Sequence, residues 1–144
     1  MATVELRFSA LPEHVRTARL VAAAVARRAG VDEAVLDEVR LAVGEACSRA
    51  VGLHQSSGIS APVRVTLIEE EKQFSIEVGD EAPRSAPGET VPGSRGDADT
   101  DAEEDEMGLA VISGLVDDVE VSAGEHGGLI RMSWPTTPPV TLVP

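Results

Sequence analysis

Apolar residues recur at three- and four-residue intervals along residues 36–51, and this spacing predicts an amphipathic helix that buries one face. The stripe consists of Leu36, Val39, Val43, Ala46, Cys47 and Ala50. An earlier helix is predicted from Pro12 to Gly30, because proline suits a first helical turn and glycine ends a helix. Asp32 is expected to cap the second helix. Helical spacing returns over residues 107–116.

Five shorter segments indicate strands, namely residues 4–9, 63–69, 73–78, 119–122 and 129–134. Residues 70–72 separate the second and third strands and predict a hairpin. Gly127-Gly128 is expected to form the turn of the last strand pair. Residues 55–62 have the composition of a loop.

This order of elements predicts an α/β two-layer sandwich, with a mixed, mainly antiparallel sheet covered on one face by helices. The chain of 144 residues is long enough for one domain, which we assign to residues 1–134. Residues 81–106 are rich in glycine, proline and then acidic residues, and they predict a flexible acidic lid. Residues 135–144 are expected to form a loose tail.

Charge and composition narrow the class of protein. A net charge of −13 argues against direct nucleic-acid binding, which requires Lys and Arg clusters, and favours a basic protein partner. Its single cysteine, Cys47, excludes an internal disulfide and is expected to be buried. No signal sequence and no run of about 20 apolar residues is present, so we expect a cytoplasmic protein without membrane association.

No metal site is expected. The histidines, His14, His54 and His126, show no ligand spacing with Cys47. The run Asp97-x-Asp99-x-Asp101 begins like a calcium loop, but Ala102 and Gly108 stand where that loop needs glycine and glutamate. A solvated acidic linker is the favoured interpretation.

Three segments together resemble a known family. Residues 41–51 read LAVGEACSRAV, residues 75–80 read SIEVGD, and residues 107–121 read MGLAVISGLVDDVEV. They resemble the Asn box and the two glycine boxes of the GHKL (histidine-kinase-like) ATPase fold. The chain is most similar to the bacterial anti-sigma factor serine kinases, whose typical helix reads LAVSEACTNAV.

The resemblance implies roles for two residues of the helix. Glu45 matches the general base of the active kinases, and Arg49 stands where they have the asparagine that holds Mg2+. A guanidinium has only donors, so Mg2+ binding is not expected here. Arg49 is interpreted as a direct phosphate contact, as a partner that lowers the basicity of Glu45, or as half of an ordinary exposed ion pair with catalysis lost.

The resemblance also assigns a site for ATP or ADP. Asp80 matches the aspartate that accepts a hydrogen bond from the adenine amino group, but both glycines that follow it in the family are replaced, by Ala82 and Arg84. The alternative is that Asp80 simply ends a strand. Gly108 and Leu109 match part of the second glycine box, where a phosphate can lie at a helix start, or they serve only as helix entry.

The implied function is that of an anti-sigma regulatory protein. Such a protein sequesters an RNA polymerase sigma factor, is released by an anti-anti-sigma (STAS-type) partner and forms a homodimer. Two alternatives stay open: an active ATP-dependent serine kinase that phosphorylates the antagonist, and a nucleotide sensor without turnover.

Overall fold

A computed structural model of the chain describes residues 2–83, 109–116 and 118–136. Strand β1 (Ala2–Phe8) leads through a 3-10 turn, η1 (Pro12–His14), into helix α1 (Val15–Ala29). A second turn, η2 (Glu33–Val35), precedes helix α2 (Leu36–Ser56), which is followed by β2 (Val63–Glu69) and β3 (Gln73–Asp80). Residues 109–115 are helical, and β4 (Asp118–Gly124) and β5 (Gly127–Pro135) complete the described fold.

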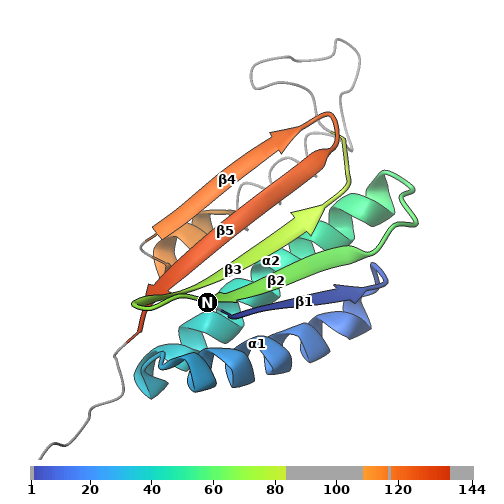
Figure 1. Ribbon diagram of the computed structural model, residues 1–144. Helices are drawn as coiled ribbons and strands as arrows, with labels where there is room; N and C mark the ends of the chain where they lie inside the picture. The colour runs from blue at the N-terminus through green and yellow to red at the C-terminus, as the bar shows by residue number, and fades with distance from the viewer. Residues whose placement is uncertain (1, 84–108, 117, 137–144) are drawn as a thin grey trace, which may run out of the picture.

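The strands form one sheet in the order β1-β2-β3-β5-β4. Figure 1 shows α1 beneath the β1 and β2 side of this sheet, with α2 running beneath its centre. The predicted two-layer sandwich is therefore confirmed. The sheet is antiparallel at each pairing among the described strands, rather than mixed as predicted, because hairpins join β2 to β3 and β4 to β5.

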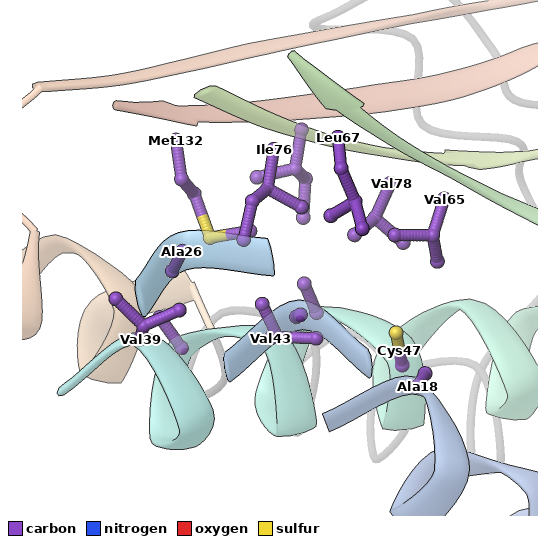
Figure 2. Packing of buried hydrophobic residues seen from close by; sticks show 14 of the residues in the cluster. Ala18, Ala26, Val39, Val43, Cys47, Val65, Leu67, Ile76, Val78 and Met132 are labelled. Carbon is purple, nitrogen blue, oxygen red and sulfur yellow. The ribbon is translucent and has the colours of Figure 1, made fainter. Parts of the chain in front are cut away.

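The core lies between the helices and the inner face of the sheet, as Figure 2 shows. Ala18, Ala22 and Ala26 of α1 are buried, and their small side chains let α1 pack closely on α2. Val39, Val43 and Cys47 of the predicted α2 stripe belong to the same buried cluster as Leu67, Ile76 and Met132 of the sheet, which lie opposite them in Figure 2. Phe74 and Trp134 stack at one end of the core, with ring centroids 6.4 Å apart.

The predicted stop of the first helix at Gly30 is confirmed, whereas Asp32 caps the 3-10 turn η2 and not α2 itself. Gly30 takes a φ of 100°, and the N–H of Val31 donates to the Ala26 carbonyl, which closes α1. Asp32 accepts a hydrogen bond of 3.0 Å from the Ala34 N–H, so it caps the short turn that leads into α2. Arg28 of α1 donates two hydrogen bonds to Glu69 of β2 and so connects α1 to the sheet.

Several predicted boundaries were wrong. Helix α2 continues to Ser56, past the predicted end at residue 51 and into the predicted loop, because His54 extends the buried stripe by another turn. The last hairpin turns at Glu125 and His126, whereas Gly127 and Gly128, predicted as the turn, belong to β5. Strand β5 ends at Pro135, and the Thr136 N–H donates to the Lys72 carbonyl, so the ordered sheet region enters the predicted tail. Most of the predicted lid and tail, residues 84–106 and 137–144, lies outside the described residues.

Candidate functional site

Helix α2 carries the first two predicted site residues on the flank that faces away from α1. Gly44 lies on the side of α2 that faces α1, because a Cβ added at Gly44 would stand 2.8 Å from the Cδ of Arg19 in α1. Arg49 follows five residues later, which at about 100° per residue places it on the other flank of the helix. Glu45 is exposed and Arg49 is half-buried.

One of the three interpretations of Arg49, an ion pair with Glu45, is not seen among the described residues. The ion pairs among the described residues do not include one that joins these two side chains, although their spacing allows it. Because its guanidinium offers only N–H donors and a positive charge, Arg49 does not fit a site for Mg2+, which needs oxygen ligands.

Asp80 is the last residue of β3, and its side chain is nearly buried, with 3% of its surface exposed. One carboxylate oxygen, Oδ1, accepts a hydrogen bond of 3.0 Å from the Ala82 N–H. This Asx turn leads the chain away from the sheet. A buried carboxylate with a fixed orientation suits recognition of an amino group, which is the role that the resemblance implies.

Gly127 of β5 closes the other side of Asp80. Its φ is +124°, and an added Cβ would stand 2.0 Å from the Asp80 carbonyl oxygen. Only glycine permits this approach, so Gly127 serves the fit of the last hairpin against the end of β3 rather than the hairpin turn.

His54 joins this strand end to α2, and sequence reasoning missed it. It is completely buried, and its imidazole bridges the Ala61 carbonyl and the Glu81 N–H, each at 2.9 Å. The signal was its position, because His54 lies four residues after Ala50 and continues the buried stripe of α2 as a polar side chain.

The candidate residues are thus arranged along α2. At 1.5 Å per residue, Arg49 lies about 7.5 Å and Glu45 about 13.5 Å along the helix axis from His54, which contacts the Asp80 end. Leu109, half-buried, begins the described part of the short helix, whereas Gly108 lies outside the described residues.

An open pocket of about 530 Å³ borders Asp80 from a different side. It is lined by Arg64, Asp80 and residues 122–129, which form the end of the β4–β5 hairpin. Since neither Glu45 nor Arg49 lines this pocket, it does not unite the predicted site residues.

Cys47 faces the core two residues before Arg49, as predicted. Burial removes the thiolate from water and raises the pKa of the thiol to about 12. A thiol with this pKa stays protonated at neutral pH, so Cys47 does not serve as a nucleophile.

The fold and these motifs define a class of protein: the chain belongs to the histidine kinase-like ATPase domain family, whose profile matches residues 8–134. It is similar to the serine-protein kinase RsbW of Oceanobacillus iheyensis, with 28% identity over 134 residues that cover 90% of this chain and 84% of that kinase. A crystal structure of the RsbU and RsbW domains of Rv1364c from Mycobacterium tuberculosis superposes with a TM-score of 0.68 at 16% identity. It covers 96% of this chain, which spans 33% of that larger chain, and shows the shared fold.

Two further properties hold for the part of the chain that the structure describes. None of its helices has both the length and the apolar character needed to cross a membrane. No group of three or more His, Cys, Asp or Glu side chains within it is arranged to hold a metal ion.

Proposed function

We propose that this chain is an anti-sigma regulatory protein that binds and sequesters an RNA polymerase sigma factor. The observation that carries the proposal is the similarity to the serine-protein kinase RsbW over nine-tenths of the chain. Release by an anti-anti-sigma protein of the STAS type belongs to the same proposal, since it is the antagonist that the resembled kinases act on.

Nucleotide recognition is a second part of the proposal. Asp80 binds the adenine of ATP or ADP, supported by its burial and fixed carboxylate, and the phosphates lie toward Arg49 and Leu109. Gly108, which lies outside the described residues, keeps the phosphate role that the sequence resemblance implies. Glu45 would act as general base in an active kinase. Because Arg49 does not fit Mg2+, phosphoryl transfer is weak or lost, and the bound nucleotide acts as a regulatory ligand.

Calorimetric titration with ATP and ADP, with and without Mg2+, tests this second part. The expected result is saturable binding that Mg2+ does not strengthen and that Asp80→Ala abolishes. Transfer of the γ-phosphate to a serine of the antagonist at rates typical of protein kinases, about 1 s⁻¹ or more, would instead establish the active-kinase alternative.

The surface of α1 is the proposed contact for the sigma factor. This helix carries four arginines and no acidic residue, in a chain of net charge −13. Leu20 is 59% exposed in its middle, and Arg16 and Arg19 flank it. An exposed leucine within a basic surface fits a partner segment that combines apolar and acidic side chains, in contrast to the basic partner that the net charge of the whole chain favours.

Co-purification with the sigma factor tests this surface. Leu20→Glu removes the apolar anchor, and we expect at least a tenfold loss of affinity because central apolar anchors dominate interface energies. Arg27→Gln at the far end of α1 is the matched control, since it lowers the net charge by the same amount. Equal affinity of both variants would place the sigma contact elsewhere.

We also propose a homodimer that forms through β1, an edge strand of the sheet. Antiparallel pairing of two β1 strands about Leu6 would place Glu5 of one copy opposite Arg7 of the other on the outer face. Within one chain the two side chains form only a loose, exposed pair at 3.5 Å, so both are available for this contact.

A further inference from the structure

His54 is the buried histidine whose two ring nitrogens both contact the backbone. Nδ1 lies 2.9 Å from the Ala61 carbonyl oxygen, just before β2, and Nε2 lies 2.9 Å from the Glu81 backbone nitrogen, just after β3. The imidazole therefore connects the last turn of α2 to two segments that are 7 and 27 residues away in the sequence.

The two partners fix the proton on the ring. A carbonyl oxygen can only accept, so Nδ1 must carry a hydrogen, and a backbone N–H can only donate, so Nε2 must be unprotonated. Both bonds form together only in the neutral Nδ1–H tautomer. A protonated ring would place two donors face to face at Glu81.

These contacts act on Asp80 through its backbone. The Glu81 N–H that His54 accepts belongs to the peptide bond immediately after Asp80. The Asp80 carbonyl of the same peptide packs against Gly127, and Asp80 Oδ1 holds the next N–H, that of Ala82. His54 of α2 is thus hydrogen-bonded to this turn.

We propose that His54 is a positioning residue, which holds the Asp80–Ala82 turn so that the Asp80 carboxylate is fixed for recognition of the adenine base. The inference rests on the nucleotide recognition proposed above. His54 acts through Asp80 and its turn; in this role it governs base selectivity rather than phosphate binding.

Two substitutions separate the contacts of the imidazole. In His54→Asn the amide nitrogen can occupy the place of Nδ1 and keep the Ala61 bond, but nothing reaches Glu81. In His54→Gln the amide oxygen can occupy the place of Nε2 and keep the bond from Glu81. The pair thus compares loss of the proposed positioning contact with its conservative rescue.

Three measurements test the proposed role of His54. Long-range 1H–15N spectra of the wild type are expected to show Nε2 unprotonated. Amide exchange is expected to accelerate at least tenfold at Glu81 in His54→Asn and to stay near wild type in His54→Gln, while Ile76 and Val78 of β3 report that each variant is folded. The ratio of ATP to GTP affinity is expected to fall at least tenfold in His54→Asn alone.

A protonated Nε2 in the wild type would overturn the assignment. So would equal amide exchange at Glu81 and equal base selectivity in the two variants, because a general loss of stability would affect both variants alike. A wild type that binds no nucleotide contradicts the proposed recognition and with it the role in selectivity. In that case amide exchange at Glu81 still decides whether His54 holds the turn. Failure of nucleotide recognition and failure of the positioning role are therefore distinguished by separate measurements.

Discussion

At the residue scale, Cys47 shows how burial controls chemistry in this molecule. Its pKa of about 12 lies above the ordinary value of 9.0, so the thiolate fraction of the folded protein at pH 8 is lower by a factor on the order of 10³. We predict that a thiol reagent labels the folded protein at least a hundredfold more slowly than the protein in urea. Equal labelling rates would show that Cys47 is accessible.

The same pKa sets a dependence of stability on pH. Because the folded pKa is raised, the unfolded chain loses its thiol proton first, and stability that is complete below about pH 9 is lost as the pH rises toward 12. Relative to Cys47→Ala, the wild type should lose about 1.4 kcal/mol of unfolding free energy between pH 8 and pH 10. Parallel pH profiles in urea denaturation would contradict this.

Gly127 is a second residue at which a substitution is expected to lower stability. Gly127→Ala would force a side chain onto the Asp80 carbonyl at a φ of +124°, and we expect a loss of at least about 2 kcal/mol of unfolding free energy. Gly124→Ala in the same hairpin is the control, since its added Cβ meets nothing within 4 Å and should change stability by less than about 0.5 kcal/mol. Similar losses for the two variants would mean that Gly127 does not approach Asp80 as described.

At the scale of elements, the 3-10 turn η2 that leads into α2 depends on its cap, Asp32. Its Oδ1 satisfies the Ala34 N–H, which has no partner within the helix, so Asp32→Ala should cost about 1 kcal/mol. Asp32→Asn keeps an acceptor oxygen and should stay within a few tenths of the wild type. Thermal unfolding of both variants measures the difference, and an Asn variant as unstable as the Ala variant would assign the effect to charge rather than to capping.

The elements that sequence analysis predicted well are those specified locally. The stripe from Leu36 to Ala50, the Gly30 stop and the Asp32 cap each depend on neighbours within a few residues, and β2 was predicted with its observed bounds. The contacts of His54 with Glu81 and of Gly127 with Asp80 join segments far apart in the sequence. No local pattern specifies them, so the glycine pair was mistaken for a turn and the histidine role was not found.

The residues of the candidate site also differ in how far local sequence predicted them. Helical spacing placed Glu45 and Arg49 on α2, whereas Asp80 was identified through the resemblance and lies two residues beyond the predicted strand 73–78, at the end of β3. Spacing permits an i, i+4 contact between Glu45 and Arg49, but rotamers and neighbours decide whether it forms, so the sequence left the role of Arg49 open.

At the scale of the whole molecule, the proposed dimer predicts a response to charge. Arg7→Glu would place like charges opposite each other across two β1 strands, so light scattering should give twice the monomer mass for the wild type and the monomer mass for this variant. The double variant Glu5→Arg with Arg7→Glu restores the complementarity and should restore the dimer. A monomeric wild type, or a dimer that ignores Arg7→Glu, would contradict pairing through β1.

Sequestration of a sigma factor is the central claim, and promoter-dependent transcription in vitro tests it most directly. With the cognate sigma factor and core RNA polymerase, an equimolar amount of this protein should reduce transcription to background, the Leu20→Glu variant should fail to do so, and an excess of the STAS-type antagonist should restore it. Transcription that persists with a tenfold excess of the folded protein, for every sigma factor of the same genome, would contradict the account.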